Sequence, residues 1–228
     1  MTNLFIISAP SGSGKSTLVE KVRQIIGDLD FSISYTTRPP RGNEQNGREY
    51  FFVSRDRFEE MRRRDDFLES ADVFGNCYGT AKCFLEQAQE NEHDLLLDID
   101  VQGAAQIKRK LPQAISIFIL PPNRTTLEQR LRHRSLDKEE VIQRRLVTAS
   151  GEIAKYQEYD YILVNDRLDE SVEALKAILL AERLKRTAKG EGDKKLLALA
   201  ERCRRTNMET DVESIRRSFE QTAVPGAR

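Results

Sequence analysis

The sequence lacks tryptophan, contains only three cysteines and two histidines, and carries no excess of charge of either sign. The cysteines are Cys77, Cys83 and Cys203, and because they form no CxxC pair, neither a disulfide framework nor a zinc site is supported. The 37 basic residues balance the 37 acidic residues, so no overall field attracts the chain to nucleic acid or to an anionic membrane. We therefore expect no nucleic-acid or membrane partner, and any anion-binding site must be local.

Long apolar runs are also missing. No stretch approaches the roughly 20 residues of a membrane span, and the N-terminus lacks the charged start and the small-residue cleavage site of a secretory signal. We expect a cytoplasmic protein. The chain has 228 residues, of which 39% are hydrophobic and 32% charged, so it is long enough for one sizeable core.

A glycine-rich loop follows the first apolar run, at 4–8, and precedes a helical pattern. It fits the relaxed pattern [AG]xxxxGK[ST], in which backbone N–H groups and the start of a helix bind a phosphate. Lys15 would reach the terminal phosphates of a nucleotide, and the hydroxyl of Ser16 would hold Mg²⁺. The candidate phosphate ligands are Ala9, Pro10, Ser11, Gly12, Ser13, Gly14, Lys15, Ser16 and Thr17. A Gly/Ser turn that happens to precede a helix is the alternative.

Apolar runs alternate with helical patterns along most of the chain. The predicted strands are 4–8, 31–34, 95–99, 115–120 and 161–164, and the predicted helices are 16–26, 101–111, 126–134 and 170–186. Continuous apolar strands separated by helices favour a parallel sheet that is covered on both faces. Ligands of such sheets bind beyond the carboxyl ends of the strands, where the glycine-rich loop lies.

Two segments interrupt the alternation. Residues 36–91 combine strand signals at 50–53, 67–73 and 77–80 with a charged helix at 55–64, which is typical of a small inserted α+β subdomain. Residues 123–158 are helical, rich in arginine and poor in large apolar residues, which favours a mobile lid. The core then consists of 1–35, 92–122 and 159–186, and a charged, weakly helical extension of unknown role follows at 187–228.

The loop Thr-Thr-Arg-Pro-Pro-Arg at 36–41 predicts a second phosphate site. Its prolines restrict the backbone toward polyproline geometry, whose three-residue period puts Arg38 and Arg41 on one side as a preformed pair. Guanidinium groups suit phosphate because each can donate two parallel hydrogen bonds. A solvated basic turn is the alternative.

Three polar residues further on predict a guanine pocket. The strand period of two turns Tyr78 and Thr80 to one face, where they could share a pocket with Glu69. A carboxylate can accept both adjacent donors on the Watson–Crick edge of guanine, whereas adenine presents one donor and one acceptor. Read alone, Glu69 is a surface acid. We also place Cys77 within this pocket and hypothesise that it makes the activity sensitive to thiol reagents.

Asp98 and Asp100 end the apolar run that begins at residue 95, and by the same period they point together. Carboxylates at the carboxyl end of a buried strand suit a Mg²⁺ shell or a hydrogen bond to a ligand. An exposed strand end is the alternative.

Together these motifs resemble those of the guanylate kinase family, whose members phosphorylate GMP with ATP. The resemblance covers the chain from about residue 4 to about residue 185. It implies an α/β fold with a P-loop NTPase-type parallel sheet core covered by helices, an inserted GMP-binding subdomain at 36–91 and a helical lid at 123–158. The implied reaction is ATP + GMP ⇌ ADP + GDP, in guanine nucleotide metabolism.

The resemblance also implies roles for individual residues. The implied GMP ligands are Ser34, Arg38, Arg41, Tyr50, Glu69, Tyr78, Thr80, Asp98 and Asp100. Arg130, Arg134 and Asn165 would join the loop at the ATP site, and the catalytic residues would be Lys15, Arg38, Arg134 and Arg145. Mg²⁺ would arrive with ATP, held by Ser16 and, through water, by Asp98. The chain departs from the family at Ser135, where we expect glycine, and in its extension.

Three alternatives are weighed against this interpretation. A scaffold module of the same family that binds proteins without catalysis is expected to lack the intact phosphate loop. A P-loop GTPase would read guanine with an NKxD motif, which the sequence lacks. A kinase for another phosphorylated acceptor is disfavoured by Glu69 together with Tyr78 and Thr80. Whether the protein forms a homo-oligomer and whether it accepts dGMP stay open.

Overall fold

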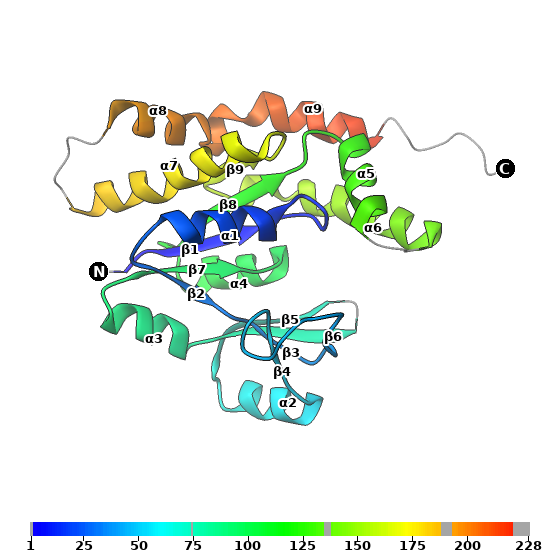
Figure 1. The fold of residues 1–228 in the computed structure, drawn as a ribbon, viewed down its shortest axis with the longest axis vertical. Helices are drawn as coiled ribbons and strands as arrows, with labels where there is room; N and C mark the ends of the chain where they lie inside the picture. The colour runs from blue at the N-terminus through cyan, green and yellow to red at the C-terminus, as the bar shows by residue number, and fades with distance from the viewer. Residues whose placement is uncertain (1, 74, 135–137, 188–192, 221–228) are drawn as a thin grey trace. The chain divides into compact units, whose positions relative to one another are not determined.

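The computed structural model describes residues 2–73, 75–134, 138–187 and 193–220 (Figure 1). These residues form two compact units. Unit 1 comprises Met1–Ile7 and Gly27–Ser116, and unit 2 comprises Ser8–Ile26 and Ile117–Arg228. Each unit combines helices with parallel strands, as the alternating sequence pattern predicts. Within the described segments, no helix is both long and apolar enough to cross a membrane.

Unit 1 contains a parallel sheet and two adjoining helices, which are β1 (Leu4–Ser8), β2 (Leu29–Ser32), β7 (Asp94–Asp98), α3 (Cys83–Glu90) and α4 (Val101–Lys110). Strand β7 lies between β1 and β2, with Leu4 opposite Leu95 and Leu29 opposite Asp94. The apolar side chains of β1 and β7 are buried, as expected of parallel strands that are covered on both faces. The strand predicted at 4–8 is confirmed. The one predicted at 31–34 lies two residues earlier, and α3 was not predicted.

A second, smaller sheet belongs to the same unit. Its strands run in the order β4-β3-β6-β5, and it is joined by one helix; the elements are β3 (Tyr35–Thr36), β4 (Phe51–Phe52), β5 (Phe67–Val73), β6 (Asn76–Ala81) and α2 (Arg55–Arg63). The strand predicted at 67–73 and the helix predicted at 55–64 are confirmed, the latter ending one residue earlier. One face of this sheet carries a cluster of buried side chains formed by Phe58, Met61, Phe67, Cys77 and Ala81.

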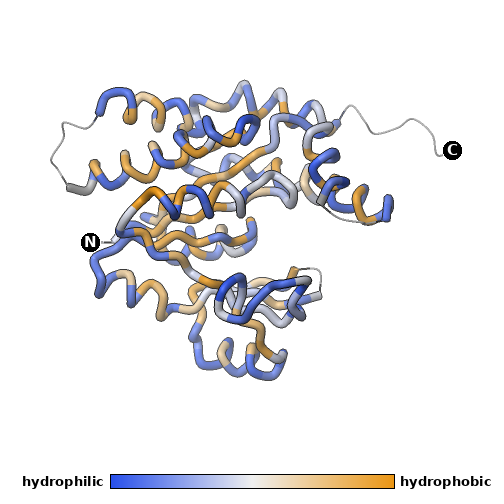
Figure 2. Tube along the Cα trace, viewed as in Figure 1, coloured by the Kyte–Doolittle hydropathy of each residue, from blue (hydrophilic) through white to orange (hydrophobic). Residues whose placement is uncertain are grey.

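Unit 2 holds a parallel strand pair and the helices that pack around it. The elements are α1 (Lys15–Ile25), β8 (Ile115–Leu120), α5 (Arg124–Arg134), α6 (Glu139–Ile153), η1 (Tyr156–Glu158), β9 (Tyr161–Val164) and α7 (Leu168–Thr187). Strands β8 and β9 match the predicted bounds, and Ile117 lies opposite Tyr161. Apolar colour follows β8 along most of its length in Figure 2. Helix α7 packs on α1.

The segment predicted to be a lid is better packed than its composition indicates. Leu127 and Leu131 of α5, and Ile142, Leu146 and Ile153 of α6, are all buried. Helix α5 begins two residues before the predicted start of 126, because the side chain of Asn123 accepts a hydrogen bond from the N–H of Thr126 at 2.8 Å. These helices therefore have an apolar face that the arginine content concealed.

The extension is also folded where it is described. It forms α8 (Lys194–Arg202), η2 (Arg205–Asn207) and α9 (Glu209–Glu220), and α8 packs on α7. Val212, Ile215 and Phe219 of α9 are buried at helical spacing. The extension is thus helical, as predicted, but more of its apolar side chains are buried than the prediction of a weakly helical segment indicated. The composition shift at 189–193 lies almost entirely outside the described residues.

Candidate functional site

The glycine-rich loop of unit 2 connects β1 to α1. Gly12 and Gly14 have φ angles of +95° and +86°, which favour glycine. The N–H of Ser13 donates to the carbonyl of Pro10 at 3.1 Å, which closes a tight turn. Gly14 is the N-cap of α1 and provides no side-chain cap, so the first N–H groups of the helix have no side-chain acceptor at the cap position. The start of α1 therefore has the geometry of an anion site.

Two residues predicted to lie at the ATP site form hydrogen bonds that stabilise the loop. The Nδ2 of Asn165 donates to the carbonyl of Ser13 at 2.8 Å. Arg130 donates through Nη2 to the carbonyl of Asn165 at 2.9 Å and through Nη1 to that of Ser13 at 3.5 Å. Arg130 and Asn165 thus both donate to the carbonyl of Ser13, which lies between Gly12 and Gly14, and they fix its orientation.

Leucines of α5 complete this support. A Cβ atom added to Gly12 would lie 2.9 Å from Leu131 and 3.0 Å from Leu127, so the helix packs directly against the loop. Lys15 is half-buried, and Ser16 and Thr17 are exposed in the first turn of α1. Arg145 is half-buried in α6. The side chain of Arg134 and all of Ser135 lie outside the described residues.

The predicted second phosphate site lies in unit 1 and is built around Arg38. Its side chain is only 6% exposed, and its Nη1 and Nη2 donate to the two carboxylate oxygens of Glu44 at 2.9 and 3.0 Å. Nη1 also donates to the carbonyl of Pro39 at 2.7 Å. The guanidinium carbon lies 5.3 Å from the ring centroid of Tyr50 and 5.8 Å from that of Phe52. Glu44 and Pro39 thus take both Nη1 hydrogens and one Nη2 hydrogen, and a hydrogen bond with Tyr78 also acts on the guanidinium.

The two arginines of the predicted pair differ in their contacts, although the charges of both lower the pKa of Glu44. The side chain of Arg41 is exposed, and its backbone N–H, not its guanidinium, donates to Glu44 at 2.7 Å. Hydrogen bonding to Arg38 lowers the pKa of Glu44 and raises that of Arg38. Glu44 was missed in the sequence, although an acid three residues after Arg41 is a signal for local pairing.

The predicted base pocket is formed on β5 and β6. Their antiparallel register places Glu69 opposite Thr80 and Ala71 opposite Tyr78, so Glu69, Thr80 and Tyr78 share one face. The hydroxyl of Thr80 donates to Oε1 of Glu69 at 2.7 Å. The ring of Tyr78 lies 5.9 Å from that of Tyr50, which in turn contacts Arg38. Contacts through Tyr78 and Tyr50 thus join Arg38 to strand β6, which also carries Thr80.

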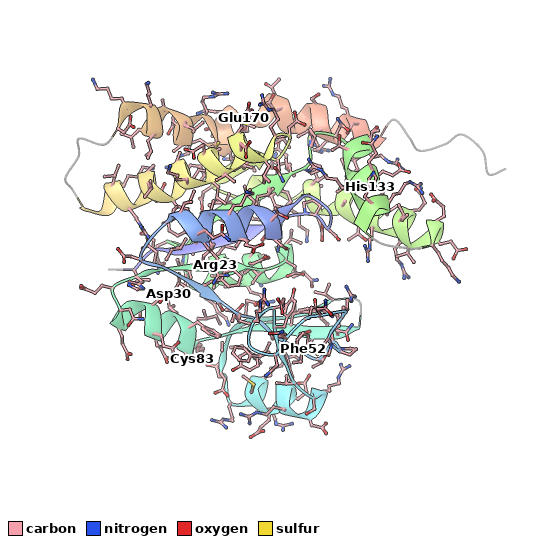
Figure 3. All side chains as sticks on the ribbon, in the orientation of Figure 1. Arg23, Asp30, Phe52, Cys83, His133 and Glu170 are labelled. Atoms are coloured by element: carbon pink, nitrogen blue, oxygen red, sulfur yellow. The ribbon has the colours of Figure 1, made fainter. Side chains whose placement is uncertain are left out.

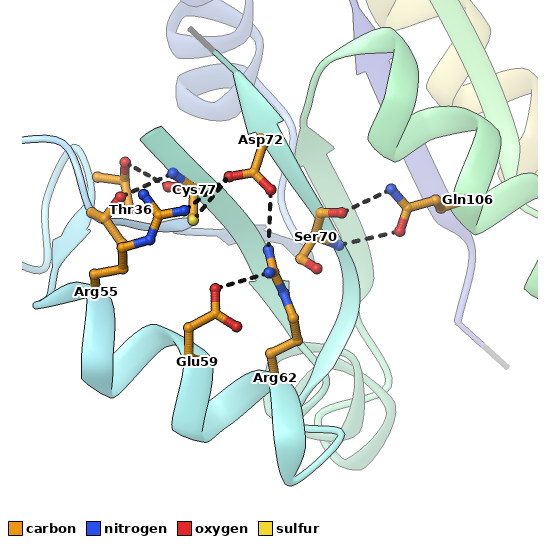
Figure 4. A network of polar contacts seen from close by, with 9 residues as sticks. Thr36, Arg55, Glu59, Arg62, Ser70, Asp72, Cys77 and Gln106 are labelled. Carbon is orange, nitrogen blue, oxygen red and sulfur yellow. Dashed lines mark hydrogen bonds and ion pairs between the residues drawn. The ribbon is translucent and has the colours of Figure 1, made fainter. Parts of the chain in front are cut away.

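Helix α4 closes the other side of the pocket. Asp100 is its N-cap and accepts the N–H of Gly103 at 2.8 Å. A Cβ atom on Gly103 would lie 2.6 Å from Oε2 of Glu69, so a side chain there would force the carboxylate to shift. Gln106 holds α4 against β5 through two hydrogen bonds with the backbone of Ser70, at 2.9 and 3.3 Å (Figure 4).

Burial determines the ionisation of Glu69. The residue is 4% exposed, and desolvation raises its pKa to about 7, with a smaller contribution from the negative charge of Asp100. A buried carboxyl whose neighbours include a hydroxyl and a second acid is suited to accept hydrogen bonds from a ligand. Asp98 ends β7 and is half-buried, as is Ser34, which immediately precedes β3.

The placement of Cys77 in this pocket was wrong. Cys77 belongs to the buried cluster on the opposite face of β6 and is 0% exposed. Its thiol donates to Asp72 at 3.1 Å, and Asp72 also pairs with Arg62 and Arg55 of α2 (Figure 4). Burial raises the pKa of this thiol. The strand period that turns Tyr78 and Thr80 to one face turns Cys77 to the other.

The loop at the start of α1 and the α/β architecture define a P-loop nucleotide-binding protein. The sequence matches the family description "Guanylate kinase" over residues 1–182. It is 56% identical over 227 residues to a guanylate kinase of Koribacter versatilis, covering 97% of both chains. It is 51% identical over 184 residues to a guanylate kinase of Escherichia coli K12, covering 80% of this chain and 89% of the other. The chain belongs to the guanylate kinase family.

A solved structure agrees with this assignment. The crystal structure of guanylate kinase from Anaplasma phagocytophilum is similar to this chain with a TM-score of 0.68 and 32% sequence identity, covering 80% of this chain and 87% of the other. The predicted fold class, an α/β fold with a parallel sheet core and helices, is confirmed.

Replacement of Gly103 by alanine should destabilise unit 1. The new methyl group would meet the buried carboxylate of Glu69, and we expect a loss of about 1–3 kcal/mol in the free energy of unfolding, measured in urea. Gly151→Ala is the matched control, because no atom lies within 4 Å of an added Cβ there. This helical substitution should raise stability by up to about 1 kcal/mol. Equal effects of the two substitutions would contradict the crowding at Gly103.

Alkylation of the folded protein should follow exposure. Iodoacetamide is expected to modify Cys83, which is exposed at the start of α3 (Figure 3), well before the buried Cys77 and Cys203. Peptide mapping by mass spectrometry measures the order. In urea all three thiols should react at similar rates, and early modification of Cys77 in the folded protein would contradict its burial.

Proposed function

We propose that the protein transfers the γ-phosphoryl group of ATP to GMP, giving ADP and GDP. The observation that carries this proposal is the buried carboxyl of Glu69, which Gly103 accommodates and Thr80 orients. When ionised, it accepts the two adjacent donors of the Watson–Crick edge of guanine. Adenine offers one donor and one acceptor there. Its acceptor would face the buried carboxylate with no hydrogen between them, which costs binding free energy.

Arg38 is the residue best placed to bind the acceptor phosphate. Glu44 and Pro39 occupy three of its five donors and fix the plane of the guanidinium. The Nε and Nη2 hydrogens on the other edge form a fork that matches two phosphate oxygens. Ser34, Arg41, Tyr50 and Tyr78 complete the acceptor set, while Asp98 and Asp100 complete the GMP site from the ends of β7 and α4.

The donor nucleotide binds the loop of unit 2. The loop from Ala9 to Thr17 surrounds its phosphates with backbone N–H groups at the start of α1, Lys15 holds the terminal ones, and Arg130 and Asn165 support the site. Mg²⁺ would arrive with ATP and supply countercharge to its phosphates, and the exposed hydroxyl of Ser16 offers an oxygen ligand of the kind that this ion prefers.

The chemical step is an in-line displacement. A phosphate oxygen of GMP attacks the γ-phosphorus, a new P–O bond forms, and the bond to the β–γ bridging oxygen breaks as ADP leaves. Catalysis then consists of positioning and of countercharge from Lys15, Arg38, Arg134 and Arg145. We place this activity in cytoplasmic purine nucleotide metabolism.

A coupled assay of ADP release tests the proposal. With Mg·ATP and each of GMP, AMP, CMP and UMP, we expect selective turnover of GMP. Equal turnover of AMP would contradict the role of Glu69, and ADP release without any acceptor would contradict phosphoryl transfer to a nucleotide.

Replacement of Arg38 by alanine should raise the KM for GMP by about 10- to 100-fold, because a charge-assisted hydrogen bond contributes about 1.5–3 kcal/mol. The KM for ATP should change much less. Arg63→Ala, an exposed position on α2, is the control and should leave both values within about twofold. An unchanged KM for GMP would exclude the assigned role of Arg38.

Binding of GMP should depend on pH through Glu69. Its pKa of about 7 means that the carboxylate is ionised only above that value, so protonation at lower pH removes an acceptor. The KM for GMP should therefore rise, approaching tenfold per pH unit below about 7. In Glu69→Gln the KM should be high throughout and lack this component. KM values measured from pH 5.5 to 8.5 for both proteins give the comparison, and parallel profiles would contradict the role of Glu69.

A further inference from the structure

The extension lies beyond the family match and yet is folded on unit 2. The match ends at residue 182, whereas α8, η2 and α9 follow it. The relative from Koribacter versatilis matches 97% of this chain and so includes the extension, while the match to the Escherichia coli relative covers 80%. The similarity to the Koribacter versatilis relative therefore reaches into the extension.

The first anchor of the extension is the edge of β9. The N–H of Ile162 donates to the carbonyl of Cys203 at 2.8 Å, and the N–H of Arg205 donates to that of Asp160 at 3.1 Å. Arg204 lies over the ring of Tyr161, 4.2 Å from its centroid, and donates to Glu182 at 3.0 Å. These contacts cover a strand edge that would otherwise present unpaired backbone groups.

The second anchor is the start of α5. The hydroxyl of Ser218, on α9, accepts the N–H of Arg124 at 3.0 Å and donates to the carbonyl of Ile215 at 2.6 Å. Arg124 is the first residue of α5, where a backbone N–H has no acceptor within its own helix. Helix α9 also packs against α6 and buries Val212 and Phe219. Ser218 thus acts as a cap supplied by a different helix.

The same helix α5 supports the phosphate loop. Leu127 and Leu131 pack beneath Gly12, and Arg130 donates to the carbonyls of Ser13 and Asn165. A shift of α5 along or about its axis would disturb these contacts, because the distances leave little clearance. The extension and the loop are therefore connected through one rigid element.

We infer that the extension positions the nucleotide-binding loop, with Ser218 as the positioning residue that fixes the start of α5. Ser218 touches no phosphate ligand; it acts through α5. The consequence is specific to the nucleotide held by unit 2. The inference rests on the proposed function for the identity of that nucleotide, ATP.

Ser218→Ala tests the inference, with Ser214→Ala as a matched control that is exposed on the same helix. We expect Ser218→Ala to raise the Kd for Mg·ATP by about 3- to 10-fold, a range set by the usual effect of losing a helix cap. The KM for GMP should stay within about twofold. Hydrogen exchange at the Arg124 amide should accelerate, and Ser218→Thr, which keeps the hydroxyl, should restore both values.

The outcomes separate this inference from the proposed function. Direct binding of Mg·ATP and exchange at Arg124 require no turnover, so failure to phosphorylate GMP would overturn the proposed function and leave these readouts intact. A Kd for Mg·ATP that is the same in Ser218→Ala and Ser214→Ala would overturn the inference. So would equal losses of ATP and GMP binding, or failure of Ser218→Thr to restore them, because both results indicate general destabilisation.

Discussion

The orientation of one backbone carbonyl, that of Ser13, is the constraint on which the nucleotide-binding half of the molecule depends. A loop that turns its N–H groups toward an anion must turn carbonyl groups toward the protein, and a buried carbonyl without a donor is costly. Asn165 and Arg130 supply the donors, and Leu127 and Leu131 fill the space beneath Gly12. The loop, α5 and the segment after β9 are therefore parts of one arrangement, and an element that holds α5 also acts on the phosphate site.

Arg38 and Glu69, two of the buried ionisable residues of unit 1, have opposite surroundings. The guanidinium of Arg38 is compensated by Glu44, which fixes its orientation and leaves one edge for a ligand. The carboxyl of Glu69 is held by a hydroxyl and lies near another acid, so it gains most from a ligand that brings two donors. On the proposed assignment, Arg38 needs only a phosphate on its remaining edge, whereas Glu69 selects the base, since a base that leaves its carboxylate unmatched bears the cost of desolvation.

Patterns that depend on burial were predicted well. The predicted bounds of the strands at 4–8, 115–120 and 161–164 match the observed bounds. A strand that is buried on both faces has a mostly apolar sequence, which is easy to recognise. The contact of Arg38 with Glu44 was not predicted, because proline geometry restricts the backbone and gives no information on which acid a side chain meets. The placement of Cys77 in the base pocket was wrong because the strand period was applied to Tyr78 and Thr80 but not to Cys77, the residue before them. The hydrogen bond between Ser218 and Arg124 spans 94 residues, and no local pattern encodes it.

Each nucleotide is assigned to a ligand set that is organised by contacts inside a single unit. Glu44, Thr80 and Gly103 organise the GMP residues of unit 1, and Asn165, Arg130 and α5 organise the ATP residues of unit 2. Effects of substitutions that share no partners add, whereas those in one network are coupled. The extension contacts α5, α6, α7 and β9, all of which belong to unit 2. If the proposed assignments hold, the extension adjusts the donor site and leaves the carboxylate of Glu69 unchanged, so affinity for ATP and specificity for guanine can evolve separately.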